Sequence, residues 1–98
     1  MEIEKIIQLK HPAGKNAVSI DKVKYEVLKV SLLNCLKTKG GLTHTEILQS
    51  VIKDFKKNKI KFDGSVEWHL EWVKLDLEAR KVIKRIGIKP QIKFAVVK

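Results

Sequence analysis

The amino-acid sequence predicts a single α+β domain built from three helices and a C-terminal β-hairpin. Three stretches of helical period occupy residues 21–37, 43–56 and 65–80, and each begins at or beside a residue able to cap a helix. Residues 81–97 change to the alternating pattern of strands, interrupted by a glycine and a proline. The 98 residues have the length of one domain, which can bury a core without disulfides or metal ions.

Residues 1–20 are expected to form an arm that packs on a domain of residues 21–98. The apolar residues of the arm have a spacing that fits a short helix or a short strand: Ile3, Ile6, Ile7 and Leu9. Pro12 disfavours helical backbone at His11, and Gly14 loosens the loop that follows. We expect the isoleucines to supply the packing contact.

The first helix, predicted over residues 21–37, is apolar on more than one side. Asp21 or Ser19 can cap its free N–H groups, and the Gly40-Gly41 pair ends it. One face has three valines and another has a tyrosine and three leucines: Val23, Val27 and Val30, and Tyr25, Leu28, Leu32 and Leu36. We therefore expect a central helix that is contacted on several sides.

The second helix begins with a capping box. The Thr43 hydroxyl can accept a hydrogen bond from the N–H of Glu46, and the Glu46 carboxylate can reach back to the N–H of Thr43. Apolar residues then recur at helical spacing: Ile47, Leu48, Val51, Ile52 and Phe55. A lysine-rich connector at residues 56–61 and a turn at Asp63-Gly64 lead to Ser65, which caps the third helix.

The third helix, residues 65–80, has two apolar lines on nearly opposite sides. The first line is Val66, Leu70, Val73 and Leu77, and the second is Trp68, Trp72, Leu75 and Ala79. A surface helix normally has one apolar stripe, so the second line needs a cover. We expect residues 1–20 or the wing to provide it, and Ile3, Ile6 and Ile7 of the arm have the right chemistry. If the second line stays exposed, its large side chains form an interface for a protein partner or a second copy of the chain: Trp68, Trp72 and Leu75.

Charge is distributed unevenly along the chain, whose net charge is +10. Residues 65–79 contain one lysine and four acids, a balance of −3, whereas residues 80–98 contain seven cations and no acid. Three glutamates and one lysine share one side of the third helix, which we call the acidic seam: Glu67, Glu71, Lys74 and Glu78. The basic C-terminal part suggests a polyanionic partner, although the same balance fits a chain that places lysine at any exposed position.

The order of elements, a helix, a short link, a helix, a turn, a helix and a hairpin, is typical of a winged helix-turn-helix domain. Residues 40–48 resemble the short strand and second-helix start of that fold. Residues 73–85 resemble the end of its third helix, where a Leu-Glu-x-x-Gly pattern leads into the wing, although Lys81 stands at the usual glycine. The chain also resembles a family of small, uncharacterised bacterial winged-helix proteins, in His11-Pro12, Lys24-Tyr25, residues 41–43, Trp68, residues 73–80 and Pro90-Gln91. This resemblance implies the fold and brings no established activity.

In winged-helix proteins the third helix usually enters the major groove and the hairpin wing contacts the backbone or the minor groove. We expect the wing of this chain to contact DNA or RNA through six cations: Arg80, Lys81, Lys84, Arg85, Lys89 and Lys93. Six phosphate contacts would give a log–log salt slope of roughly −5. Phosphates would repel the acidic seam of the helix itself. The alternative is a protein-interaction or homodimerisation module that binds no nucleic acid.

Other chemistries lack their sequence signals. His11, His44 and His69 have no metal-ligand spacing, and Cys35 is the single cysteine, expected to pack as a small hydrophobe. The sequence has no glycine-rich phosphate loop and no Gly-x-Ser-x-Gly elbow, so we infer no enzyme, cofactor, metal or small-molecule substrate. It has no long apolar run and no signal-peptide pattern. We expect a cytoplasmic protein without membrane contact.

Overall fold

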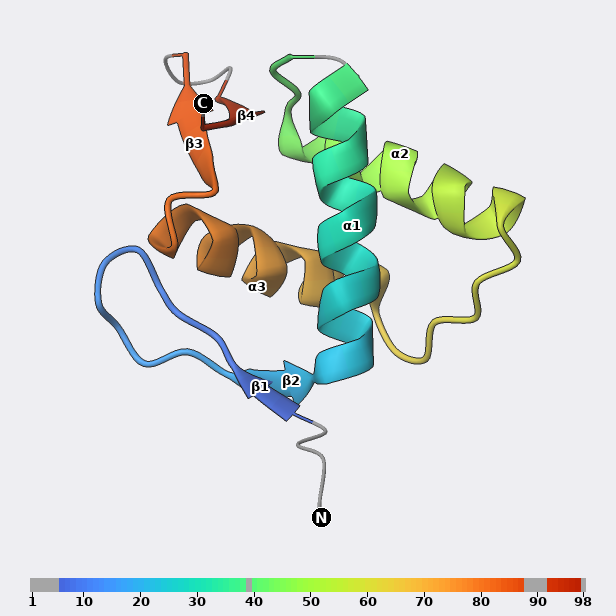
Figure 1. Cartoon of the computed structure of the whole chain (residues 1–98), viewed down its shortest axis with the longest axis horizontal. Coiled ribbons are helices and arrows are strands. Elements are labelled where there is room, and N and C mark those ends of the chain that lie inside the picture. Colours follow the sequence, from blue (N-terminus) through green and yellow to red (C-terminus); the bar gives the residue numbers. More distant parts are fainter. Residues whose placement is uncertain (1–5, 39, 88–91, 98) are drawn as a thin grey trace.

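The computed structural model describes residues 6–38, 40–87 and 92–97. In these ranges the chain forms three helices and two small antiparallel sheets of two strands each (Figure 1). The helices stand between the two sheets, which lie at different ends of the molecule (Figure 1). None of the described helices is long and apolar enough to cross a membrane.

The N-terminal segment is a β-hairpin joined directly to the first helix. Strand β1 (Ile6–Gln8) pairs antiparallel with β2 (Ser19–Asp21), so the strand alternative for the arm is confirmed. Leu9 and Ile20 are buried in the core, whereas Ile6 is 61% exposed. The packing contact therefore comes from Leu9 and Ile20, with Ile7 partly buried against the core, and not from Ile6. Ile3 lies outside the described residues.

Helix α1 (Lys22–Thr38) contacts both other helices and both sheets. Asp21 caps it, since its Oδ1 accepts from the N–H groups of Val23 at 2.8 Å and Lys24 at 3.2 Å. The tyrosine and leucine face is buried as predicted. The valine face is largely in solvent, with Val23 71% and Val30 56% exposed, so the expectation of contact on several apolar sides is wrong for this face.

Helices α2 (His44–Lys57) and α3 (Val66–Ala79) begin where the sequence placed their caps. Both bonds of the capping box form: the Glu46 N–H donates to Thr43 Oγ1 at 3.2 Å, and the Thr43 N–H donates to Glu46 Oε1 at 2.9 Å. The Ser65 hydroxyl accepts from the N–H of Trp68 at 3.1 Å. These local signals explain why the predicted helix starts are correct.

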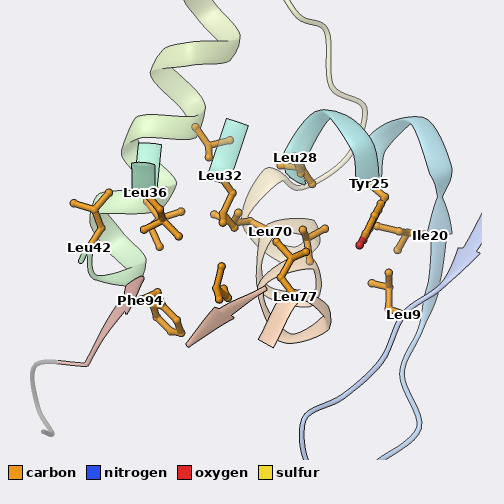
Figure 2. Close-up of a cluster of buried hydrophobic side chains, with 14 of the residues drawn as sticks. Leu9, Ile20, Tyr25, Leu28, Leu32, Leu36, Leu42, Leu70, Leu77 and Phe94 are labelled. Atoms are coloured by element: carbon orange, nitrogen blue, oxygen red, sulfur yellow. The ribbon is translucent and has the colours of Figure 1, made fainter. Parts of the chain in front are cut away.

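The core joins side chains from every element of the described chain (Figure 2). Leu36, Leu42 and Phe94 meet at one end, and the Tyr25 ring lies beside Leu9 and Ile20 at the other (Figure 2). The first apolar line of α3 enters this core, since Leu70, Val73 and Leu77 are fully buried. One of its two predicted apolar lines therefore packs into the core of the domain. The second line is the part of α3 that is available for a functional contact.

The C-terminal hairpin pairs β3 (Ile83–Ile86) with β4 (Lys93–Val96). Leu42 forms an isolated antiparallel β-bridge with Phe94: its N–H donates to the Phe94 carbonyl at 3.0 Å, and its carbonyl accepts from the Phe94 N–H at 2.7 Å. Residues 88–91, which include the predicted turn at Pro90, lie outside the described part. The predicted hairpin is confirmed in its strands.

Lys81 closes the C-terminus of α3 in a left-handed conformation, with φ of 63°. The Val82 N–H donates to the Leu77 carbonyl at 2.9 Å, and the Lys81 N–H donates to the Glu78 carbonyl at 3.0 Å. These two bonds define a Schellman motif, whose left-handed residue is usually glycine. Lys81 therefore adopts the backbone expected at the glycine of the Leu-Glu-x-x-Gly pattern, at a steric cost.

Candidate interaction surface

The second apolar line of α3 is only partly covered. Trp72, Leu75 and Ala79 are half-buried, whereas Trp68 is 46% exposed. The cover comes from the loop of the N-terminal hairpin, where the His11 ring meets the Trp72 ring edge-on at 6.4 Å between centroids. The expectation that Ile6 covers this line is wrong, because Ile6 is in solvent. The structure therefore leaves an indole at the surface near the start of α3.

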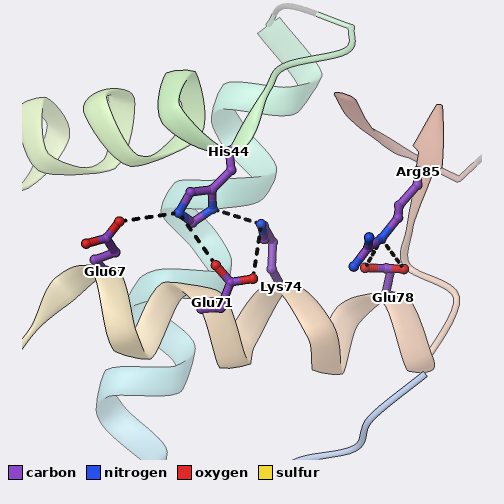
Figure 3. Close-up of polar contacts among 6 residues, drawn as sticks. All are labelled: His44, Glu67, Glu71, Lys74, Glu78 and Arg85. Atoms are coloured by element: carbon purple, nitrogen blue, oxygen red, sulfur yellow. Dashed lines mark hydrogen bonds and ion pairs between the residues drawn. The ribbon is translucent and has the colours of Figure 1, made fainter. Parts of the chain in front are cut away.

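The acidic seam of α3 is paired inside the chain (Figure 3). His44, at the start of α2, places its Nδ1 2.8 Å from Lys74 Nζ and its Nε2 3.6 Å from a Glu71 carboxylate oxygen. Lys74 Nζ is also 3.5 Å from Glu71 and lies 4.2 Å from the centroid of the Phe94 ring. Burial lowers the pKa of Lys74, and the Glu71 carboxylate partly offsets this effect. This cluster fixes α3 against α2 and the hairpin.

Two of the six expected phosphate-binding cations are engaged by acids of α3. Arg85 Nε donates to both Glu78 carboxylate oxygens, at 3.0 and 2.9 Å (Figure 3). Its guanidinium also lies over the Phe94 ring. Arg80 Nε donates to both Asp76 oxygens, at 3.0 and 2.9 Å. These pairs reduce the positive charge that both arginines offer to an outside phosphate.

Two of the remaining lysines of the C-terminal hairpin lie on its outer face. Because Ile83 and Phe94 face the core, the alternation of strands places Lys84 and Lys93 on the outer face of the hairpin. Lys84 and Lys81 are exposed and Lys93 is half-buried. No ion pair of these three lysines occurs within the described ranges. Lys89 lies outside the described residues.

A buried carboxylate that the sequence did not single out connects three distant segments. Asp76 of α3 is 0% exposed. Its Oδ1 accepts from the Lys10 backbone N–H at 2.8 Å, and its Oδ2 accepts from the Tyr25 hydroxyl at 2.7 Å. With Arg80, these donors satisfy the buried charge. One sequence signal could have identified Asp76: it lies four residues before Arg80, in the gap between the two apolar lines of α3.

The described part of the chain contains no group of three or more histidine, cysteine or acidic side chains that could hold a metal ion. Its polar clusters instead join elements: Asp76 joins the N-terminal hairpin, α1 and α3, and Glu78 joins α3 to β3. The candidate interaction surface consists of the outer faces of α3 and of the C-terminal hairpin, where Trp68, Lys84 and Lys93 lie.

The chain belongs to a family of unknown function, DUF6958, whose model matches residues 6–93. Comparisons with curated proteins and with solved structures give no match. The family membership therefore leaves the function to be inferred from the geometry above.

Proposed function

We propose that the chain is a non-enzymatic winged-helix domain that binds the phosphate backbone of DNA or RNA through its C-terminal hairpin. The fold part of this proposal is supported by the order of the three helices and the hairpin, and by the pairing of Leu42 with Phe94. That bridge joins the link between the first two helices to the hairpin, at the position where the sequence resembles the short strand of the winged-helix fold. Fold alone does not establish function, so the proposed function depends on the side chains exposed at the surface.

The observation that carries the proposal is the outer face of the hairpin, where Lys84 and Lys93 lie with Lys81 at its root. The outward side of α3 offers an exposed tryptophan and acidic side chains, which suit neither phosphates nor base edges. We therefore propose backbone contact without reading of sequence. Three lysine–phosphate contacts would give a log–log salt slope of roughly −3, shallower than six cations would give.

The proposal assigns no catalytic role, cofactor or small-molecule substrate to the chain. Among the groups of α1 and α3 that could serve in acid–base chemistry, Tyr25, Asp76 and Glu78 are engaged in contacts between elements. Burial raises the pKa of the Cys35 thiol, which keeps it in the unreactive protonated form. A single cysteine also fits the proposed cytoplasmic location.

The test measures binding of the full chain to a labelled mixed-sequence DNA duplex and to a single-stranded RNA of equal length, by fluorescence anisotropy. We expect complexes at ~50 mM salt that weaken strongly at ~200 mM salt. The Lys84→Gln/Lys93→Gln variant should flatten the salt slope by about two phosphate contacts. The matched control is Lys53→Gln/Lys57→Gln, which removes the same charge from exposed positions of α2. No complex at ~50 mM salt, or an equal effect of the control, would overturn the proposal.

A second candidate function is protein association through the outward side of α3. The exposure of Trp68 favours it, because tryptophan is among the residues that dominate interface energetics. Trp72 and Leu75 extend this surface, although both are half-buried in the monomer.

A further inference from the structure

A groove with an apolar floor and a basic rim lies between the C-terminal half of α2 and the connector to α3. This open groove has a volume of about 390 Å³, within the range of protein ligand sites. Three exposed lysines and five apolar side chains line it: Lys56, Lys59 and Lys61, and Ile52, Phe55, Ile60, Phe62 and Val66. None of these described lining residues is acidic. The groove fits an occupant with one large apolar group flanked by carboxylates.

A surface of that chemistry lies in the first turns of α3. Trp68 is 46% exposed, and the Glu67 carboxylate beside it is 67% exposed. Glu67 contacts His44 Nε2 only at 3.8 Å, and the half-exposed Glu71 follows one turn later. These carboxylates remain accessible for pairing with lysines of another molecule. We call Glu67, Trp68 and Glu71 the acidic tryptophan patch.

The groove and the acidic tryptophan patch are neighbours on one molecule. Val66 lines the groove and directly precedes Glu67 and Trp68 in the sequence. Ring contacts also connect the two: Phe62 meets His69 at 5.1 Å, and His69 meets Trp68 at 4.9 Å between centroids. The two complementary surfaces therefore adjoin each other.

We propose that two copies of this chain associate around a two-fold axis, with Trp68 of each copy seated in the groove of the other. In such an interface every contact occurs twice. The patch of each copy therefore meets the groove of the other, and both surfaces of both copies are buried in one closed dimer. The indole would cover the apolar floor, and Glu67 would meet the lysine rim. This inference rests on the second candidate function and names a second copy of the chain as its partner.

Overall charge opposes this association, because each copy has a net charge of +10. At ~150 mM salt the Debye length is about 8 Å, so long-range repulsion is largely screened. Contacts between carboxylates and lysines at the interface persist over such short distances, and burial of the indole does not depend on charge. We therefore expect the dimer to form at near-physiological salt and to weaken at low salt.

The first test is sedimentation of the full chain at ~150 mM salt over a range of concentrations. We expect a monomer–dimer equilibrium whose dissociation constant rises at least ~tenfold in Trp68→Ala. The control is Val23→Ala, which shortens an exposed apolar side chain of α1 and should leave the equilibrium unchanged. A wild-type chain that stays monomeric, or a Trp68→Ala variant that dimerises equally well, overturns the proposal.

A charge exchange tests the reciprocal contact. Lys56→Glu/Lys61→Glu makes the groove rim acidic, whereas Glu67→Lys replaces the carboxylate that meets this rim with a cation, so each variant alone should remain monomeric. Mixed in equal amounts, they should form a heterodimer, because both of its contacts then join opposite charges. Circular dichroism confirms that each variant is folded. A mixture of folded variants that stays monomeric contradicts reciprocal docking, and growth beyond two copies contradicts the two-fold axis.

The wing variant separates this inference from nucleic-acid binding. Lys84 and Lys93 lie on the outer face of the C-terminal hairpin and do not line the groove. Lys84→Gln/Lys93→Gln should therefore keep the dimer while losing affinity for DNA or RNA. Dissociation of the dimer by this variant would contradict the proposed interface.

Discussion

The Tyr25 hydroxyl donates a hydrogen bond of 2.7 Å to Oδ2 of Asp76. This bond crosses the core from α1 to α3, and the other oxygen of the same carboxylate holds the backbone of Lys10. A fully buried carboxylate is stable only when its acceptors are used, so Tyr25 and Asp76 stabilise each other's position.

Replacing Tyr25 with phenylalanine should destabilise the fold. Tyr25→Phe keeps the ring in the core but removes one donor to a buried charge, and a hydrogen bond to a charged group contributes about 1.5–3 kcal/mol. We expect a loss of this size in the free energy of unfolding, measured by urea denaturation. Val23→Ala, at an exposed site on the same helix, should change it by less than about 0.5 kcal/mol. Equal stability of Tyr25→Phe and wild type would show that the bond contributes nothing.

The same bond predicts a loss of stability in alkali. Burial raises the pKa of Tyr25, and the hydrogen bond to Asp76 and its negative charge raise it further. In the unfolded chain the hydroxyl ionises near pH 10, so above that pH the unfolded state loses a proton that the folded state keeps. The stabilising contribution is therefore complete below pH 10 and decreases as the pH rises through the raised folded-state pKa.

Denaturation of wild type and Tyr25→Phe at several pH values above 10 measures this loss. The stability difference between them should shrink as the pH increases. Tyr25 is the single tyrosine, so ultraviolet absorbance reports its ionisation directly. Tyrosinate that appears near pH 10 while the chain is still folded would contradict the prediction.

Lys81→Gly should stabilise the chain. A non-glycine residue in the left-handed region costs roughly 1–2 kcal/mol, part of which is offset by the greater freedom of glycine in the unfolded state. We expect a gain of up to about 1 kcal/mol, measured as a higher thermal midpoint. Arg80→Gly is the matched control, because Arg80 has φ of −84° and also pairs with Asp76. That control should destabilise the fold, and a gain from both glycines would refute the backbone explanation.

Thr43→Ala should shorten or fray the start of α2. The substitution removes the side-chain acceptor of the capping box, which costs about 1 kcal/mol, within a range of about 0.5–2 kcal/mol. Ser65→Ala removes the corresponding cap of α3 and provides a comparison of similar chemistry. Amide hydrogen exchange at the first turn of each helix locates the effect. Faster exchange at α2 in the Ser65 variant, instead of at α3, would contradict the assignment of the caps.

The sequence predicts the helices well because their ends depend on nearby residues. The Thr43–Glu46 capping box and the Ser65 cap each act within one turn, and the alternation of Lys93, Phe94 and Ala95 decides which side of the strand is buried. These signals require no knowledge of distant contacts.

The candidate surface is less predictable because it depends on how elements cross. The sequence places Glu78 on the acidic seam, but its pairing with Arg85 depends on the direction that β3 takes after α3. The partial cover of Trp72 depends on His11, which the pairing of β1 with β2 brings to α3. The burial of Asp76 was missed for the same reason.

The contact between Asp76 and Lys10 also affects the order in which a new chain can fold. The two residues are 66 positions apart, so the first hairpin and α1 are synthesised well before the acceptor that they share. A two-stranded hairpin is marginal by itself in water. Cotranslational intermediates that end before α3 should therefore keep the N-terminal strands open and Tyr25 unprotected, and synthesis of the third helix should close the fold in a late cooperative step.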